Sequence, residues 1–440
     1  MTAYQPYPSY RPSNVEWLGD LPEHWEQRRL KFIAPPVTDK VSKKPVDKLY
    51  LGLENVESGT GQLLLEAPTE NVESIVTLFQ VGDVLFGKLR PYLAKVVLAE
   101  FDGVCTGELL ALRPIARFVE NKFLFYTLLS HGFINVIDSM TYGAKMPRAN
   151  PNQIGNMTIS LPPLAEQRTI AKFLDNETAH IDSLIAKKRE LIDLLDKKRT
   201  SIISHAVTKG LNPKARMKSS GVEWLGDVPE HWDVRRLKHL LRRGFTNGLF
   251  KKKEDFGNGT RLVNVSDIYQ ADFLIKINTL ERVTATEQEV KVFSVQSGDI
   301  FFVRSSLKQE GVAASACMLE VPEPTVFESH VVRARPNSSL VIPKYLIYYL
   351  NSSLARQRLI SLSETTTMTT VAQPKLSSLE VAFPSLAEQH DIVNLIDKRI
   401  FDIDELKKQI TQSIDLLQKQ RTALISAAVT GKIDVREQGN

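Results

Sequence analysis

The chain has 440 residues, of which 42% are hydrophobic and 24% are charged. These values are typical of folded globular proteins and exclude disordered and collagen-like classes, and the length predicts two to four domains. The net charge of +5 is small. Its basic excess lies in residues 211–386, which is compatible with nucleic-acid binding without requiring it.

Targeting signals and cysteine motifs are missing from the sequence. The first twenty residues have no basic start followed by an apolar run, and no stretch has the roughly eighteen uninterrupted apolar residues of a membrane helix. We therefore expect a cytoplasmic protein that does not span a membrane. Cys105 and Cys317 lie far apart and outside any Cys-x-x-Cys pair. They are expected to be reduced, buried thiols, and no metal site is predicted.

An internal repeat begins near the N-terminus. Residues 13–31 match residues 220–238 at 15 of 19 positions, and both copies read Val-Glu-Trp-Leu-Gly-Asp, Pro-Glu-His-Trp and Arg-Arg-Leu-Lys. The two copies contain all four tryptophans, Trp17, Trp25, Trp224 and Trp232. Stacking on bases is an alternative role for these rings, but the surrounding Gly and Pro turns and the duplication favour core anchors. We expect His24 and His231 to make structural hydrogen bonds.

We call residues 13–31 and 220–238 the tryptophan frames. The blocks that follow the two frames differ in length, because the offset between matching residues is 207 in the frames and 222 after the blocks. Both blocks keep a short strand-like run after a glycine, at residues 83–86 and 299–302, followed by an Arg-Pro pair and an aromatic helix start. Each block is therefore predicted to form one mixed α/β domain.

A second repeat predicts two long helices. Residues 164–210 match residues 386–432 at 21 of 47 positions, with proline before and glycine near the end of each copy. Apolar residues recur at alternating steps of three and four, as in a coiled coil. The predicted seam is Leu174, Ile181, Leu195 and Ile202 in the first copy and Ile396, Ile403, Ile410, Leu417 and Leu424 in the second. Lys188, Lys198 and Gln420 make it partly polar. At about 1.5 Å per residue, each helix is roughly 65 Å long and needs a partner, for which the other copy is the obvious choice.

Two motifs mark the borders of the repeats: Gly-Asp-x-Pro-Glu-His-Trp at the head of a domain, and Leu-Pro-Pro-Leu-Ala-Glu-Gln-Arg before a long helix that ends Ile-Ser-His-Ala-Val-Thr-Lys-Gly-Leu at residues 203–211. In these motifs and in their order, the whole chain resembles the specificity subunits of type I restriction-modification systems. The second copy departs from this pattern at Ser385 and at Gly431-Lys432.

The resemblance implies a mixed α+β fold with pseudo-two-fold symmetry. Target-recognition domains are expected at 1–163 and 211–385, long helices that pair as an antiparallel coiled coil at 164–210 and 386–432, and a tail at 433–440. The resemblance further implies that each domain reads one half of a bipartite site in double-stranded DNA, while the helices set the spacer and dock two modification subunits. Those subunits use S-adenosylmethionine, and the restriction subunits use ATP and Mg²⁺, so no cofactor is expected on this chain. A duplicated chain with matching repeats and different blocks between them suits a protein that reads two different half-sites.

No catalytic site is predicted. Residues 82–88 have the Gly-x4-Gly-Lys spacing of a phosphate-binding loop, but Leu89 stands where Ser or Thr would hold Mg²⁺, and the second copy lacks the lysine. We interpret them as a strand and turn. Asp272 with Glu289 and Lys291 loosely resembles a nuclease metal site and is interpreted as surface charge. There is neither an Asn/Asp-Pro-Pro-Tyr-like tetrapeptide nor a glycine-rich cofactor loop, so a self-contained nuclease or methyltransferase is disfavoured.

The candidates for DNA contact are basic residues of the two variable blocks that lie outside the apolar runs. They are Lys88, Arg90, Lys145 and Arg148 in the first block and Lys251, Lys252, Lys253, Arg304 and Lys308 in the second. Residues 143–151 are rich in Gly and Pro, which predicts an exposed loop for Lys145 and Arg148. For each candidate, a solvated surface charge and a DNA contact both remain open.

Two other functions remain open. The chain could serve a related restriction-modification enzyme that cleaves without ATP-driven translocation, which would change its partner rather than this chain. It could also be a coiled-coil scaffold that binds only protein, an interpretation that the near-neutral charge of residues 1–164 supports.

Overall fold

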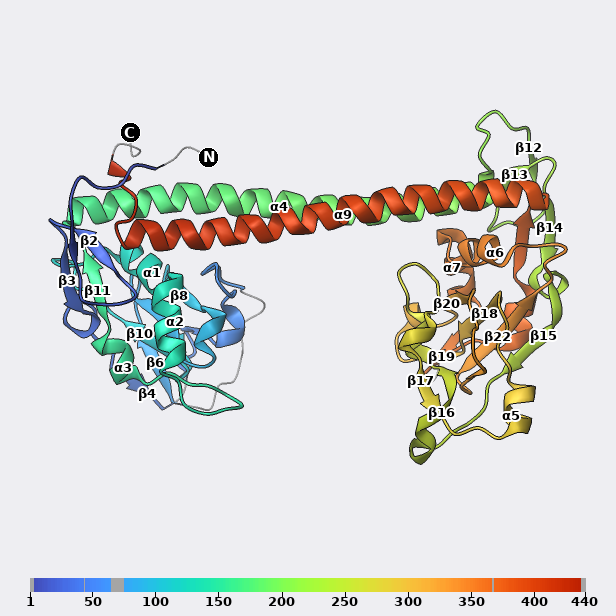
Figure 1. Cartoon of the computed structure of the whole chain (residues 1–440), viewed down its shortest axis with the longest axis horizontal. Helices are drawn as coiled ribbons and strands as arrows, with labels where there is room; N and C mark the ends of the chain where they lie inside the picture. Colours follow the sequence, from blue (N-terminus) through green and yellow to red (C-terminus); the bar gives the residue numbers. More distant parts are fainter. Residues whose placement is uncertain (1–3, 43, 65–74, 366–367, 437–440) are drawn as a thin grey trace. The chain divides into compact units, whose positions relative to one another are not determined.

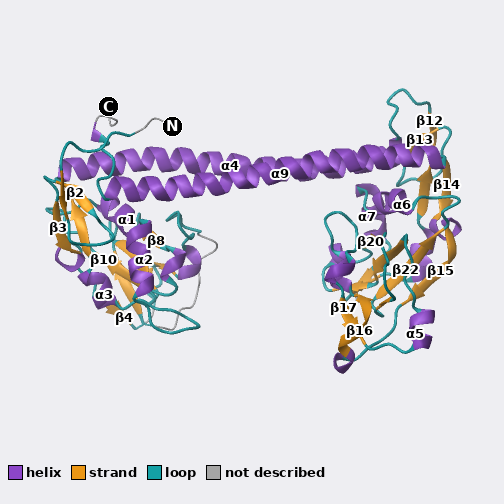
Figure 2. Ribbon diagram, viewed as in Figure 1, coloured by secondary structure: helices purple, strands orange, loops and turns teal. Residues whose placement is uncertain are grey.

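The computed structural model describes residues 4–42, 44–64, 75–365 and 368–436. The chain divides into two compact units: unit 1 combines Met1–Arg189 with Thr411–Asn440, and unit 2 is Glu190–Ile410. Two long helices, α4 (Leu164–Lys209) and α9 (Leu386–Val429), each contribute one part to each unit. We call the part of unit 1 that precedes α4 domain 1, and the part of unit 2 between α4 and α9 domain 2. Both domains mix helices and strands, which confirms the predicted fold class (Figures 1 and 2).

Domain 1 is built on two small sheets. Its elements are β1 (Tyr10–Pro12), β2 (Asp20–Pro22), β3 (Glu26–Arg29), β4 (Lys40–Val41), β5 (Leu49–Leu51), β6 (Val76–Phe79), β7 (Val84–Gly87), β8 (Val96–Leu98), β9 (Gly103–Cys105), β10 (Leu109–Leu112), α1 (Asn121–Leu129), α2 (His131–Ser139), α3 (Pro151–Asn156) and β11 (Thr158–Leu161). One sheet has the order β4-β6-β9-β5, with β5 parallel to β9, and the other has the antiparallel order β10-β7-β8. The pairs β1-β2 and β3-β11 complete the domain.

Domain 2 repeats this plan with more strands. Its elements are β12 (Met217–Ser219), β13 (Asp227–Pro229), β14 (Asp233–Arg236), β15 (Leu241–Asn247), β16 (Phe256–Val263), β17 (Glu281–Val283), α5 (Glu287–Val292), β18 (Asp299–Val303), β19 (Ser305–Ser306), β20 (Ser315–Met318), β21 (Thr325–Phe327), β22 (Val331–Pro336), α6 (Pro343–Leu350), α7 (Ser353–Ser361), β23 (Glu364–Thr365), β24 (Thr369–Thr370), α8 (Gln373–Ser378) and β25 (Glu380–Phe383). The sheet orders are β15-β22-β18-β20, β17-β16-β21 and β19-β24-β23, with β12-β13 and β14-β25 as pairs.

The second tryptophan of each frame anchors a core, as predicted. Trp25 is 1% exposed and packs in unit 1 with residues of both long helices, and Trp232 is 0% exposed and does the same in unit 2. The indole Nε1 of Trp25 donates to Glu166 on α4 (3.0 Å), and that of Trp232 donates to Glu388 on α9 (3.1 Å). The frame therefore fixes each domain to the first turn of a long helix.

The histidines of the frames bind the same carboxylates. Nε2 of His24 lies 2.8 Å from Glu166, and Nε2 of His231 lies 2.8 Å from Glu388. The predicted structural role of both histidines is confirmed by these contacts. Gly210 adopts a φ of +74° directly after α4, the left-handed conformation that commonly ends helices and favours glycine.

The long helices pair antiparallel within unit 2. Asp196 and Arg199 on α4 contact Lys407 (2.6 Å) and Asp404 (3.1 Å) on α9, so the partner number falls as the α4 number rises. Of the nine predicted seam residues, seven are buried: Leu174, Ile181, Leu195, Ile396, Ile403, Ile410 and Leu424. Ile202 and Leu417 are partly exposed, and their neighbours Ile203 and Ile414 are buried.

Both cysteines are free and buried. Burial raises the pKa of the Cys105 thiol and of the Cys317 thiol to about 12 in each case. Both thiols are therefore protonated at neutral pH and are poor nucleophiles. Within the described part of the chain, no helix combines the length and the apolar character that crossing a membrane requires.

Candidate nucleic-acid interface

The four basic candidates of domain 1 lie on two segments that are joined by their backbones. Lys88 and Arg90 directly follow β7, and residues 141–149 run beside them. The amide of Arg90 donates to the carbonyl of Pro147 (2.7 Å), and the amide of Ala149 donates to the carbonyl of Lys88 (2.9 Å). Isolated bridges join Leu89 and Tyr142 to Arg148. The fold thus brings together candidates that the sequence separates by more than fifty residues, and we call Lys88, Arg90, Lys145 and Arg148 the domain 1 patch.

Members of the domain 1 patch differ in the exposure and ion pairing of their charged groups. Arg90 and Lys145 are exposed, whereas Arg148 forms an ion pair with Glu108. Lys88 is half-buried, and burial lowers its pKa; Glu108 opposes this shift, while the positive charges of Arg148 and Lys40 add to it. Arg90 and Lys145 are consequently the members best placed to meet a phosphate or a base edge.

Exposed aromatic side chains accompany the patch. Tyr92 follows Arg90 and is 53% exposed, and Tyr142 on the facing segment is 59% exposed. Sequence reasoning missed both, and it also missed Lys40, whose charge acts on Lys88. The sequence signal of the two tyrosines was weak, because single surface tyrosines follow no periodicity. Arginine, lysine and tyrosine side chains are all common phosphate ligands in protein–DNA complexes.

Domain 2 has the same backbone arrangement at the corresponding position. Arg304 directly follows β18, and the amide of Val371 donates to its carbonyl (3.0 Å). The strand β19 pairs with β24, which pairs with β23, in the place where Leu89, Arg148 and Tyr142 make bridges in domain 1. Arg304 and Lys308 are exposed, and Leu307 between them is 85% exposed. A pocket of about 680 Å³ beside them is lined by residues that include Tyr269, Lys308 and His330.

The other three candidates of domain 2 lie in a different place, just before β16 in the sheet β17-β16-β21. Lys251 forms an ion pair with Glu289 (2.8 Å), and its side chain is only 12% exposed. Lys252 lies 3.9 Å from Glu254, and Lys252 and Lys253 are exposed. The structure therefore assigns Lys251 to an internal ion pair rather than to an open basic surface.

The segments that were tested for catalysis have structural roles. Asp83 is 1% exposed and forms a two-bond ion pair with Arg113 (2.9 and 2.8 Å) beside β7, and the equivalent Asp299 binds Arg335 (2.7 Å for both bonds) beside β18. The interpretation of residues 82–88 as a turn and strand is confirmed. Glu289 caps α5, where it pairs with Lys251.

Comparison with known families gives a match over most of this architecture. The family model described as type I restriction modification DNA specificity domain matches residues 71–194 and 229–416, which is more than half of the chain. The chain belongs to this family. The matched segments include the domain 1 patch, the Arg304 segment and large parts of both long helices of this specificity subunit.

Curated relatives match the specificity subunit along its length. It is 24% identical to the type I restriction enzyme MjaVIII specificity subunit of Methanocaldococcus jannaschii, over 97% of each chain. It is 23% identical to the StySPI specificity subunit of Salmonella potsdam, over 94% of this chain and 90% of that one.

Solved structures share the fold of this specificity subunit. One comes from a study of complex assembly and conformational transition of the type I restriction-modification system, with a TM-score of 0.70, 18% identity, and coverage of 93% of this chain and 98% of that chain. The HsdS subunit from Thermoanaerobacter tengcongensis matches with a TM-score of 0.52 and 19% identity, over 94% and 98% of the two chains.

Proposed function

We propose that domain 1 and domain 2 each read one half of a bipartite site in double-stranded DNA. The observation that carries this proposal is the shared backbone arrangement with different side chains. Lys88 and Arg148 on the paired segments of domain 1 correspond to Arg304 and Thr370 in domain 2. Base edges are distinguished by the side chains that reach them. One scaffold with two sets of side chains would therefore suit two different half-sites.

The domain boundaries belong to the same proposal. Residues 1–163 and 211–385 would be the two recognition domains, and residues 164–210 and 386–432 would be the helices that set the spacer. The tail at 433–440 is described only as far as residue 436, and its last four residues lie outside the described part of the chain.

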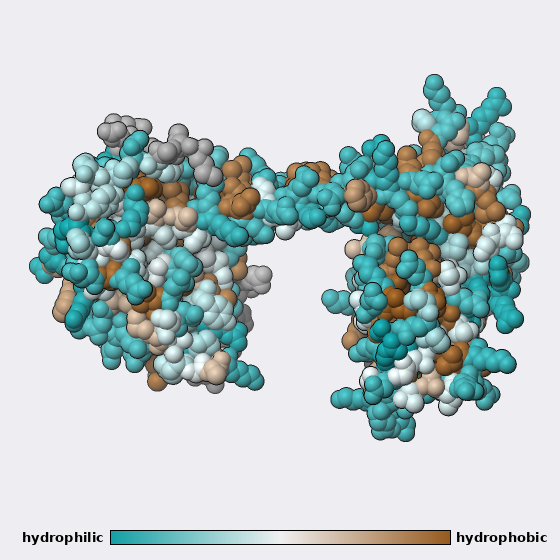
Figure 3. Space-filling view, in the orientation of Figure 1, coloured by the Kyte–Doolittle hydropathy of each residue, from teal (hydrophilic) through white to brown (hydrophobic). Residues whose placement is uncertain are grey.

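We further propose that the long helices dock two modification subunits. Several apolar side chains of the helices are exposed: Leu191, Leu194, Phe401 and Leu406 in unit 2 and Leu416 in unit 1. Figure 3 shows hydrophobic patches among the hydrophilic residues of the helices. Exposed apolar side chains of this kind support contact with a protein partner. The modification subunits would use S-adenosylmethionine, and the restriction subunits that join through them would use ATP and Mg²⁺. The complex would work in the cytoplasm on double-stranded DNA.

The bipartite proposal is tested by exchanging one variable block. Residues 32–160 are replaced by the corresponding block of another member of the family, and methylated sites of the complex with the modification subunit are mapped by sequencing. We expect one half-site to change and the other to persist. Methylation by the purified chain alone, or a simultaneous change of both halves, would contradict the proposal. A protein-only scaffold would leave the methylated sites unchanged.

The role of the domain 1 patch is tested with Arg90→Ala. We expect the complex to bind its site about tenfold more weakly, and the slope of log affinity against log salt to fall by about one if the contact is to a phosphate. Arg117→Ala is the matched control, because Arg117 is an exposed arginine of domain 1 that lies over the Phe118 ring (4.6 Å). Equal binding by the two variants, measured by fluorescence anisotropy across a salt series, would remove Arg90 from the interface.

A further inference from the structure

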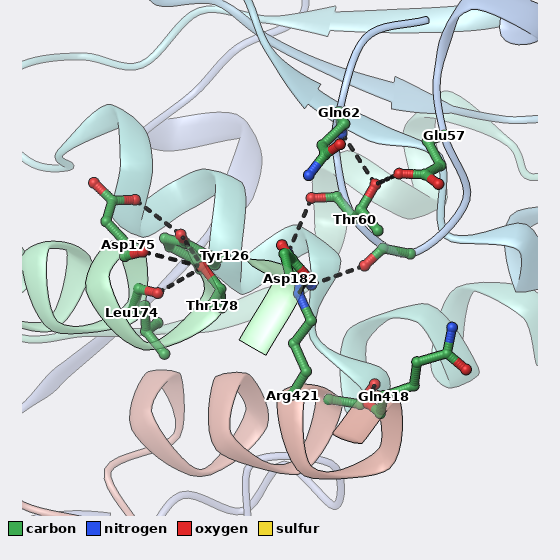
Figure 4. A network of polar contacts seen from close by, with 12 residues as sticks. Glu57, Thr60, Gln62, Tyr126, Leu174, Asp175, Thr178, Asp182, Gln418 and Arg421 are labelled. Carbon is green, nitrogen blue, oxygen red and sulfur yellow. Dashed lines mark hydrogen bonds and ion pairs between the residues drawn. The ribbon is translucent and has the colours of Figure 1, made fainter. Parts of the chain in front are cut away.

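A buried arginine ties domain 1 to the helix pair. Arg421 on α9 is 6% exposed, and its guanidinium donates to both carboxylate oxygens of Asp182 on α4 (3.0 and 3.3 Å). It also donates to the carbonyls of Gly59 (2.9 Å) and Thr60 (3.2 Å) in the loop of residues 57–62. Figure 4 shows Arg421 pointing toward Asp182 and this loop. One side chain thus joins α9, α4 and domain 1.

Unit 2 contains a second arginine of the same kind. Arg199 on α4 is 9% exposed and donates to Asp404 on α9 (3.1 Å) and to the carbonyl of Ala271 in domain 2 (2.7 Å). Arg199 and Arg421 occupy the same position of the helix repeat, as do Asp182 and Asp404. The two loops that they bind belong to the blocks that have diverged. The helix repeat has therefore kept one arginine and aspartate pair for two different loops.

Stability alone does not account for this choice of residue. The arginines lie along the apolar seam, where a buried ion pair is often no more stabilising than a well-packed apolar side chain. What an apolar residue could not supply is a fork of directed hydrogen bonds that holds a loop at a fixed place. A geometric role therefore fits the repeated guanidinium better than a role in stability.

In domain 1, the bound loop leads to the domain 1 patch. The amide of Gly59 donates to the carbonyl of Ala94 (3.1 Å), which directly follows the short helical turn Pro91–Leu93, and that turn follows Arg90. The loop is held in shape by Thr60, which donates to Glu57 (2.6 Å), and by a bond from the amide of Glu57 to the carbonyl of Gln62 (2.9 Å). A displacement of Arg421 would consequently move the loop at Gly59, and through the Gly59–Ala94 hydrogen bond it would move the turn that follows Arg90.

In domain 2, the equivalent contact leads to the Arg304 segment. Tyr269, two residues before Ala271, donates its hydroxyl to the carbonyl of Gly311 (3.3 Å) and lines the same pocket as Lys308. Both arginines are thus linked to the candidate DNA-contact segment of their own domain.

The arginine contact is also a third attachment of domain 1 along the helix pair. Domain 1 already contacts α4 at Glu166, through Trp25, and at Asp175, to which the hydroxyl of Tyr126 donates (2.8 Å). Asp182 lies sixteen residues beyond Glu166, or about 24 Å at about 1.5 Å per residue. Attachments spread over that length resist rotation of the domain about any one of them.

We propose that Arg421 and Arg199 are positioning residues that fix the angle at which each recognition domain is held on the helix pair, and that they thereby restrict the gap that the specificity subunit accepts between its half-sites. This inference rests on the proposed reading of a bipartite site. It requires no contact between either arginine and DNA.

The test uses Arg421→Met and Arg199→Met in the complex with the modification subunit, with methylated sites mapped by sequencing on a library in which only the gap varies. We expect the half-site bases to stay the same, and methylation at gaps one base pair longer or shorter to rise about tenfold relative to the native gap, as expected for the loss of a hydrogen bond to a charged group. Arg421→Lys keeps the charge but cannot serve the carboxylate and both carbonyls, so it should give an intermediate result. Lys419→Met is the control, since Lys419 is exposed on α9 two residues before Arg421.

The outcomes separate this inference from the proposal on which it rests. If the wild-type complex methylates no bipartite site, the proposed function fails. If the wild type has a bipartite site and the folded methionine variants keep its gap preference while losing only melting temperature, the arginines are merely structural and the inference is wrong. Should Arg421→Met not fold, the gap profile of Arg421→Lys decides in the same way.

Discussion

Insertion of seven residues into each long helix is expected to lengthen the gap between the two half-sites by about three base pairs. Seven residues keep the apolar seam in phase and add about 10 Å at about 1.5 Å per residue, and base pairs are stacked about 3.4 Å apart. The insertions are placed after Arg189 in α4 and after Ile410 in α9, at the points of the sequence where the chain passes from one unit to the other. The ion pairs of Arg421 and Arg199 then remain inside their own units.

The half-site sequences should not change in this variant. Three additional base pairs rotate one groove face by roughly 100° at about 10.5 base pairs per turn, so weaker binding is expected as DNA twist or domain tilt absorbs the rotation. An insertion of four residues in each helix is the control, because it moves the seam out of phase. An extended complex that folds, methylates DNA and still prefers the original gap would show that the helices do not set the spacer.

Glu166→Leu should be more destabilising than the equivalent substitution of Glu388, the other carboxylate that binds a tryptophan frame. Glu166 is 8% exposed and accepts hydrogen bonds from Trp25 (3.0 Å) and from the hydroxyl of Tyr7 (2.6 Å), in addition to its contact with His24. Two buried donors without an acceptor destabilise a protein by about 1–3 kcal/mol each. We therefore expect the melting temperature of unit 1 to fall by roughly 5–15 °C in scanning calorimetry.

Glu388→Leu is the matched control in unit 2. Glu388 binds Trp232 and His231 in the same way, but its side chain is 28% exposed, and Lys214 stands at the repeat position of Tyr7. Water can replace part of the hydrogen bonding that Trp232 and His231 lose, so the fall in the melting temperature of unit 2 should be smaller. Equal losses for the two variants would show that the Tyr7 contact and the deeper burial of Glu166 contribute nothing.

The repeats predicted the parts of the fold that repeat. Trp25 and Trp232 were assigned to cores because identical apolar and turn residues surround them, and the seam followed from the spacing of leucine and isoleucine. The pairing of Leu89 with Arg148, which brings the two basic segments of domain 1 together, could not be predicted, since it depends on how residues 141–149 fold back beside β7, and no motif marks that pairing.

Arg199 and Arg421 were missed because a search for apolar seams treats charged residues as interruptions. A signal was present, since both arginines and both of their aspartates are identical in the two copies of the helix repeat. Lys251 shows what charge alone cannot predict: the fold places its ammonium group against Glu289.

The assembly of unit 1 from two distant stretches has a consequence for synthesis of the chain on the ribosome. Unit 2 is one continuous stretch, Glu190–Ile410, whereas unit 1 needs Thr411–Asn440 to complete its core, to which Leu424 and Val429 belong. Domains generally fold as units while the chain emerges, the earlier one first. Here the order is reversed, because the domain that is translated first needs residues from Thr411 onward to complete unit 1. Truncation directly before Thr411 would therefore remove part of the core around domain 1 and leave unit 2 with all of its residues.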